Sequence, residues 1–438
     1  MNRLIQNHID KLFIALVILI FFSSGRNLLV THYVLGGAGN TALMTLVFIL
    51  VVMLFLLHLV FSHGSLYIRH SQKKLIIVSA CLAGYFFMHE FIFGDSFISA
   101  KYAVFLFLII LSLMVRYNAY FVFKVLGYIG GFVSLIIILQ QFLLLTINNG
   151  DISQFNVVID GEEWSRANGC DYVAPYGLGL IERCIWGLDV NIYGFKINRS
   201  IFFSTEPKYI SSLLLVTLAS ILISKTESLL KFWSILLHLA ALIFISSASS
   251  ILILFISLFL ILIRVIGPIL YSSVVFLFPI FVLPLLFSLL AQITGIDGFI
   301  LNRLMSASSD IGEGGLQTLS FFGQAYGACD KSSCDDDGLL SNLIDTYGMI
   351  GLVIFWFFLY FLIRPMFKII RSRNINISTS LGLMILLNTY IVFNLYFFGD
   401  IFNMFGLMIL LTIILLPEYI EENKTVISSN NVEFIKIN

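Results

Sequence analysis

The residues best suited to do chemistry are a few charged side chains at the ends of long apolar runs. Arg199 and Glu206 come at the start of one such run, and Arg303 and Asp337 lie in the polar stretch before another. Charged groups next to segments that enter a bilayer are costly, which makes them functional candidates. Arginine binds phosphate through paired hydrogen bonds, and a carboxylate can take a proton from a hydroxyl group. The four residues predict a catalytic site that binds a phosphate and moves a proton.

Polar neighbours extend this predicted site. We expect contacts with substrate from Arg183, Lys208, Tyr209 and Asn342. Structural roles are also open to the central residues. Glu206 and Pro207 form a typical helix start, and Arg199 could anchor the chain at the membrane surface. Arg303 could form an ion pair with a nearby carboxylate, and Asp337 could cap a helix.

Other ionisable residues lie within or beside the remaining apolar runs. They could relay protons, or they could be helix caps and satisfied polar groups: His89, Glu90, Asp95, His238 and Asp400. The acidic run 335–338 lacks the alternating spacing and the distal glutamate of a calcium loop. We therefore expect neither a metal ion nor a cofactor.

The elements that must position these residues follow from composition. Of the 438 residues 59% are hydrophobic and 11% are charged, and the mean hydropathy is +0.99. Soluble domains carry about 25% charged residues, so lipid must solvate much of this chain. The formal net charge of zero gives no basic surface for nucleic acid.

Apolar runs of roughly 20 residues predict membrane-spanning helices. We expect an all-α polytopic membrane protein with about twelve such helices, in which residues 1–438 form a single integral membrane domain. The predicted spans are 11–30, 41–61, 74–93, 100–116, 119–147, 206–224, 230–246, 248–265, 268–291, 340–363, 378–397 and 399–417.

Most lysines and arginines fall in connections on the N-terminal side of these spans, which predicts that this side is cytoplasmic. Both termini, including the tail 424–438, are then cytoplasmic. Two long polar loops, 148–205 and 292–339, lie on the periplasmic side. Loops of this length are usually functional or disordered, and we expect short helices or hairpins in them.

Four of the five cysteines fall in these two loops. Cys170 and Cys184 lie in the first, and Cys329 and Cys334 lie in the second. Cysteines gathered on one face predict an oxidising compartment, with a disulfide within each loop. Other pairings and free thiols stay open, because four cysteines allow three connectivities.

At these loops the sequence resembles the O-antigen polymerases, the Wzy-type enzymes of bacterial surface polysaccharide. Arg199 is followed by Phe203 and by Glu-Pro at 206–207, like the helix entry after the first loop in that family. Asp337 is followed by leucines and by Tyr-Gly-Met-Ile-Gly-Leu at 347–352, like the family's second-loop pattern. The predicted spans, two enlarged loops and short turn at 246–250 resemble its architecture.

The resemblance implies a glycosyltransferase of the bacterial inner membrane. Its substrates would be undecaprenyl-pyrophosphate-linked oligosaccharides, one as donor and one as acceptor, and a chain-length regulator and a flippase are possible partners. Arg199 and Arg303, with Arg183 as a third group, would stabilise the pyrophosphate, and Glu206 or Asp337 would be the base. Two alternatives stay open. The related O-antigen ligases use a histidine in the second loop, and no histidine occurs in either long loop here. A lipid-linked oligosaccharide flippase or transporter would favour related halves, which the sequence does not show.

Overall fold

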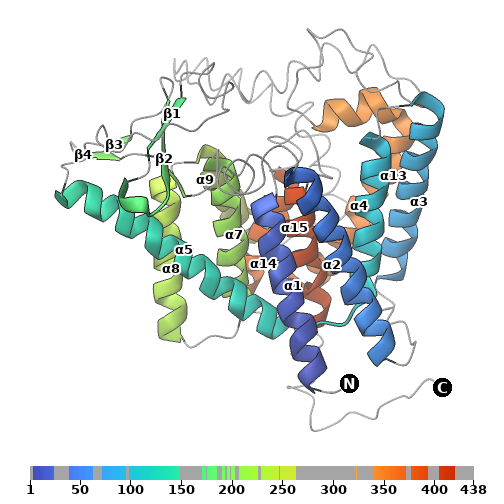
Figure 1. Cartoon of the computed structure of the whole chain (residues 1–438), viewed down its shortest axis with the longest axis horizontal. Coiled ribbons are helices and arrows are strands. Elements are labelled where there is room, and N and C mark those ends of the chain that lie inside the picture. The colour runs from blue at the N-terminus through green and yellow to red at the C-terminus, as the bar shows by residue number, and fades with distance from the viewer. Residues whose placement is uncertain are drawn as a thin grey trace.

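The computed structural model describes residues 3–23, 39–62, 72–94, 98–147, 170–173, 175–184, 190–192, 195–197, 199–202, 207–224, 228–245, 247–262, 322, 339–370, 376–392 and 404–419. These residues are mostly helical, as predicted. Figure 1 shows the helices side by side, with a small sheet at one end of them.

The described helices are α1 (Arg3–Ser23), α2 (Gly39–Phe61), α3 (Lys73–Phe93), α4 (Ile98–Leu113), α5 (Ala119–Ile147), α7 (Pro207–Ile223), α8 (Ser228–Ile245), α9 (Ala248–Leu262), α13 (Leu339–Ile370), α14 (Ile377–Val392) and α15 (Met404–Ile414). Each predicted span overlaps one of them except 268–291, which lies outside the described residues. Within the described part of the chain, α1, α3, α5 and α13 contain the 4 segments that are long and apolar enough to cross a membrane. Several of the others are shorter apolar helices.

Helix α5 is longer than a bilayer crossing requires. Its 29 residues span about 43 Å at 1.5 Å per residue, whereas the hydrocarbon core is about 30 Å thick. A helix with this excess fits the core by tilting. Figure 1 shows α5 inclined across the neighbouring helices, and its end approaches the sheet.

The start of α1 and the residues that follow α15 meet at one end of the bundle, which we call the terminal end. The backbone N–H of Tyr117 donates to Oε2 of Glu418 at 2.6 Å, and that of Asn118 donates to Oδ1 of Asp10 at 2.8 Å. Tyr117 lies in the connection between α4 and α5. Burial raises the pKa of its hydroxyl above the ordinary value, and the nearby Glu418 carboxylate raises it further.

Helix α7 lies at the centre of the packing and contacts α5, α8, α9 and α14. Glycines on its neighbours make the close approach possible. A Cβ on Gly130 of α5 would collide with Thr217 of α7 and with His238 of α8. His238 is fully buried, and its ring nitrogens lie 3.1 Å from the Thr217 hydroxyl and 2.7 Å from the Ser234 carbonyl. These contacts match the expectation of a satisfied polar group.

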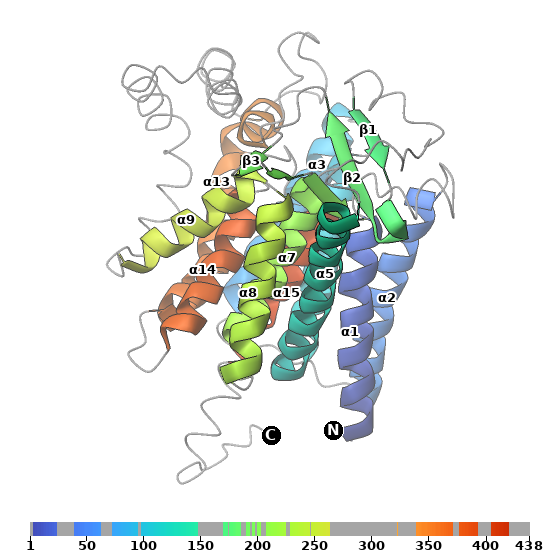
Figure 2. The ribbon, with the colours of Figure 1, turned by 90° about the vertical axis from the view of Figure 1, so that its left-hand side faces the viewer.

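The other end of the bundle carries the strands, and we call it the sheet end. Strands β1 (Cys170–Val173), β2 (Leu180–Cys184) and β5 (Arg199–Phe202) form an antiparallel sheet in the order β1-β2-β5. Strands β3 (Val190–Ile192) and β4 (Phe195–Ile197) form a second antiparallel pair. Figure 2 shows these strands above α5, α7 and α8. The hairpins expected in the first long loop are present.

Candidate functional site

Strand β5 holds Arg199 at the junction between the sheet and the helices. The Nε–H of Arg199 donates to the carbonyl of Ile245, the last residue of α8, at 3.3 Å. Helix C-termini carry a partial negative charge, so a guanidinium is favourable there. The Arg199 side chain is partly buried. Its position is therefore set by the end of a helix.

Gln140 of α5 docks the sheet on the bundle, and we did not predict it from the sequence. Its Nε2 donates to the carbonyl of Gly179 at 2.8 Å, and its Oε1 accepts from the Ser200 hydroxyl at 2.8 Å. Gln140 and Ser200 are fully buried. Gly179 has a φ of 125° and lies against the backbone of Phe202, where a Cβ would have contacts of 3.1–3.3 Å. The polar pair at 140–141 within an apolar run was the available signal.

The strand register aligns charged residues. Across β2 and β5 the Cα partner of Arg199 is Glu182, and across β1 and β2 the partner of Arg183 is Asp171. Cross-strand pairs of opposite charge stabilise antiparallel sheets by roughly 0.2–1 kcal/mol. The register thus puts a carboxylate residue opposite each arginine of the predicted first-loop site.

The same register bears on the disulfide prediction. Cys170 and Cys184 are Cα partners at the end of the β1–β2 ladder. Directly opposed antiparallel residues have Cα atoms about 4.5–5.5 Å apart, and disulfides have Cα separations of about 4.4–6.8 Å. The Cys170–Cys184 bridge stays a prediction, which this register supports. Cys329 and Cys334 lie outside the described residues.

Helix α7 begins at Pro207, as expected for a proline in the first helical position. Lys208 follows in the first turn, and Tyr209 is half-buried with its carbonyl accepting from the Ser212 hydroxyl at 3.3 Å. The predicted catalytic residues Glu206, Arg303 and Asp337 lie outside the described residues.

Helix α13 is broken at Gly348, which has φ 61° and ψ −165°. Only glycine adopts this conformation readily. In Figure 1 the first part of α13 lies across the sheet end before the helix turns down beside α3 and α4. The prediction of one continuous span over 340–363 is wrong here. Asn342 belongs to the segment before the break.

Tyr347 is the residue at the break, and polar contacts converge on it. The Tyr85 hydroxyl of α3 donates to the Tyr347 carbonyl at 2.6 Å. The Tyr347 hydroxyl lies 3.0 Å from the Ser99 hydroxyl of α4. The Ser99 backbone N–H donates to Oε2 of Glu90 at 3.2 Å, so Glu90 is a cap for α4, one of the roles we expected.

Aromatic rings surround the same residue. The Tyr347 ring centroid lies 4.6 Å from that of Phe86 and 4.8 Å from that of His89. A Cβ on Gly351 would collide with the Cβ of Tyr347 and approach the Tyr85 ring. Gly351 therefore allows close packing at this point, whereas Gly348 makes the turn.

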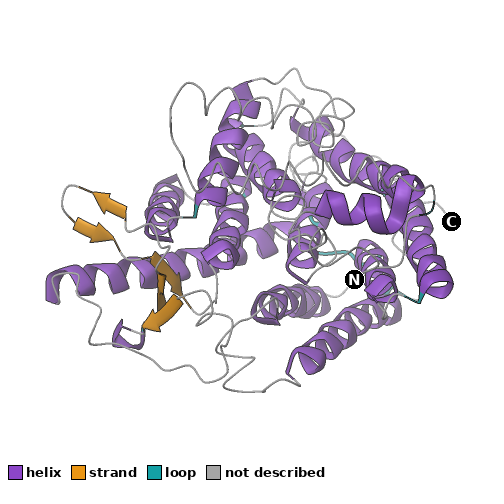
Figure 3. Ribbon diagram, turned by 90° about the horizontal axis from the view of Figure 1, so that it is seen from above, coloured by secondary structure: helices purple, strands orange, loops and turns teal. Residues whose placement is uncertain are grey.

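The described parts of the predicted site lie in two places. Arg199 is on β5 and Tyr209 is at the start of α7, and both elements pack against α5 and α8, whereas Asn342 is in the first part of α13, near α3 and α4. Figure 3 shows from above that the strands lie toward one side of the molecule. The structure does not bring these two groups together.

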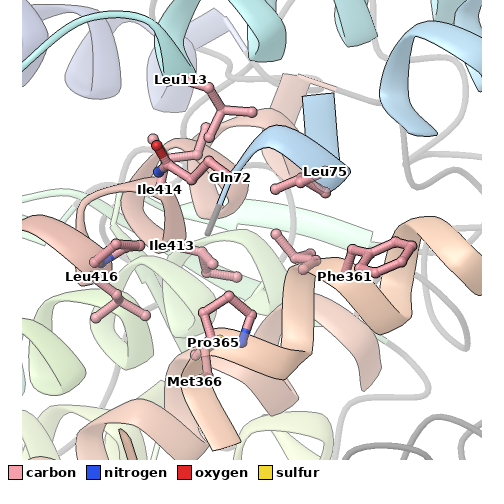
Figure 4. Close-up of a pocket in the computed structure, with 11 residues that line it drawn as sticks. Gln72, Leu75, Leu113, Phe361, Pro365, Met366, Ile413, Ile414 and Leu416 are labelled. Atoms are coloured by element: carbon pink, nitrogen blue, oxygen red, sulfur yellow. The ribbon is translucent and has the colours of Figure 1, made fainter. Parts of the chain in front are cut away.

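A small pocket lies at the terminal end, far along the bundle from both groups. Figure 4 shows it between α3, α13 and the residues that end α15, with Leu75, Phe361 and Ile413 in its wall. Gln72 is the one amide side chain among its otherwise apolar lining residues. The lining offers no group for phosphate or proton chemistry.

No protein-family model matches the sequence, and no curated protein or solved structure matches it either.

Proposed function

We propose that this protein is an O-antigen polymerase, which joins undecaprenyl-pyrophosphate-linked repeat units at the periplasmic face of the bacterial inner membrane. The observation that carries the proposal is the position of Arg199. It is tied to the C-terminus of α8 at the sheet end, opposite to the terminal end of the bundle. The charged pyrophosphate of a lipid-linked substrate lies at the membrane surface, which in the proposed topology is where the helices meet the polar loops.

The proposed topology has about twelve spans, with both termini in the cytoplasm and the loops 148–205 and 292–339 in the periplasm. Two findings support it. The start of α1 and the residues after α15 share one end of the bundle, and the strands of the first loop lie at the other. This arrangement needs an even number of crossings.

In the proposed reaction, a sugar hydroxyl of the acceptor repeat unit attacks the anomeric carbon of the donor glycan. The bond between that carbon and the pyrophosphate oxygen breaks as the new glycosidic bond forms. Undecaprenyl pyrophosphate leaves with the bonding electrons, and the hydroxyl proton passes to Glu206 or Asp337. Arg199 and Arg303, with Arg183, stabilise the charge that develops on the leaving group.

The test is complementation of a strain that lacks the native gene, with the protein level measured for each variant. Arg199→Ala should abolish the long-chain polysaccharide and leave one repeat unit on each acceptor. Arg364→Ala is the matched control, because Arg364 is an exposed arginine on the part of α13 that runs toward the terminal end. Its polysaccharide should be normal.

Three results would contradict parts of the proposal. Normal long chains in both Arg199→Ala and Arg303→Ala would remove the phosphate-binding role. Full activity of Glu206→Gln would remove that residue as the base. A deletion strain that carries no repeat unit on its acceptor would indicate a flippase or a ligase instead.

A further inference from the structure

The break in α13 creates a carbonyl that needs a partner. When a helix ends, its last carbonyls lose their donors from the following turn. The glycine conformation at Gly348 ends the first part of α13 in this way, and Tyr347 is 3% exposed, so water has little access to it. The Tyr85 hydroxyl takes the place of the missing donor, at 2.6 Å.

The same hydroxyl also contacts the second long loop. It lies 3.2 Å from the carbonyl of Phe322, the one residue of the interval 292–338 that the structure describes. The Tyr85 hydroxyl has one hydrogen, which the carbonyls of Tyr347 and Phe322 share. The contact with Tyr347 is shorter and is therefore the stronger hydrogen bond. One side chain of α3 thus meets two backbone carbonyls that lie on either side of Asp337 in the sequence.

A second contact, from α4, fixes Tyr347 at the break in α13. Ser99 is fully buried near the start of α4, and its hydroxyl lies 3.0 Å from that of Tyr347. Its backbone N–H is in turn bound by Glu90. The segment before the break is therefore fixed from both α3 and α4.

We propose that Tyr85 is a positioning residue for the second-loop half of the active site. Its hydroxyl sets the position of the backbone at residues 339–347, which include the predicted substrate-binding residue Asn342, and the position of Phe322. The ligand so positioned is the pyrophosphate and sugar portion of a lipid-linked repeat unit. The substrate assignment depends on the proposed polymerase function, whereas the positioning of the backbone does not.

Tyr85→Phe is the decisive variant, because it removes the hydroxyl and keeps the ring against Phe86 and His89. Tyr360→Phe is the matched control. It removes a tyrosine hydroxyl from α13 after the break and keeps a ring that stacks on Trp356. Ser99→Ala loosens Tyr347 from the side of α4 and gives a second, independent perturbation.

The first measurement is hydrogen exchange of the full-length protein in detergent. In Tyr85→Phe the amides of residues 339–347 should exchange about tenfold faster, as expected for the loss of one hydrogen bond. The amides of α1 and α5 should be unchanged, and Ser99→Ala should show a smaller change in the same segment. Exchange at 339–347 that equals that of Tyr360→Phe would overturn the positioning role.

The second measurement is polymerisation kinetics in proteoliposomes, with an undecaprenyl-pyrophosphate-linked repeat unit as the probe. For Tyr85→Phe we expect KM to rise about threefold to tenfold with a smaller change in kcat, because the binding groups lose their position. If the unmodified protein polymerises and Tyr85→Phe has the same KM and kcat, the inference is wrong. If the unmodified protein does not polymerise, the proposed function fails, and the exchange result alone decides whether Tyr85 positions the segment.

Discussion

The hydroxyl of Ser200 donates a hydrogen bond to Oε1 of Gln140 across 2.8 Å, which joins strand β5 to helix α5. The other end of the same amide binds the carbonyl of Gly179. One buried glutamine therefore binds strand β5, which carries Arg199, and the residue that precedes strand β2.

Gln140→Leu should destabilise the protein. The substitution leaves the Gly179 carbonyl and the Ser200 hydroxyl without these partners in a buried position, at a cost of about 1–3 kcal/mol for each group. A lower Tm in detergent is the expected result. Thr146→Ala is the control, because Thr146 is exposed on the same helix and bonds only within it. Equal Tm values for the two variants would contradict the docking role of Gln140.

The neighbouring glycines at 130 and 131 should respond in opposite ways to alanine. A methyl group on Gly130 would collide with Thr217 and His238, and such overpacking costs about 1–3 kcal/mol. A methyl group on Gly131 meets nothing within 4 Å, so Gly131→Ala should keep or raise the stability by up to about 1 kcal/mol. Thermal unfolding of the two variants side by side tests this packing, and a similar loss in both would refute it.

Gly348→Ala should strain the break in α13. An alanine at φ 61° and ψ −165° costs about 1–3 kcal/mol, or the segment 339–347 must take another direction. We expect a lower Tm and, under the proposed function, shorter polysaccharide. Gly84→Ala on α3 is the control, because a Cβ at that position meets nothing within 4 Å. A Gly348→Ala protein with unchanged Tm and unchanged product would argue against the break.

Cys170 and Cys184 should be protected from thiol reagents until they are reduced. The test uses Cys329→Ser/Cys334→Ser protein and a membrane-permeant maleimide. Cys81 is a free cysteine of α3, and in protein unfolded in SDS it is the internal reference that reacts without reductant. Labelling should rise from one to three cysteines after reduction. Three labelled cysteines before reduction would show that the β1–β2 pair does not carry a disulfide.

The stability of the terminal end should fall in alkali because of Tyr117. Its ordinary pKa is 10.0, and in the folded protein burial and the Glu418 carboxylate raise it. The folded state therefore keeps the proton more tightly than the unfolded state, so stability is full below pH 10 and falls as the pH rises above it. Tyr117→Phe should flatten the Tm profile between about pH 9 and 11. An unchanged slope in Tyr117→Phe would contradict this role of Tyr117.

The approximate positions of the helices could be predicted because a bilayer demands long apolar runs, and each run other than 268–291 overlaps a described helix. The start of α7 at Pro207 could also be predicted from the sequence, because proline suits the first helical position. These features depend on local composition and do not require knowledge of which segments are neighbours.

The site contacts depend on such knowledge and could not be predicted. Tyr85 and Tyr347 are 262 residues apart in sequence, and nothing in either apolar run marks them as partners. Strand β5 was missed because its sequence, Arg-Ser-Ile-Phe, is short and adjoins a helix entry, and Phe202 has a φ of 55° that is rare for a side-chain-bearing residue. A glycine at position 348 could allow close helix packing or a sharp turn, and the sequence alone does not distinguish these two roles.

Because of the turn at Gly348, residues 339–347 form a short helical segment that lies across the sheet end of the bundle, and we call this segment the ledge. A substrate held in the membrane by a long lipid tail would reach such a ledge by diffusing sideways within one leaflet. Its encounter rate would then depend on the number of lipid-linked molecules per unit area, and diluting the vesicles at constant lipid composition would leave the turnover per enzyme unchanged.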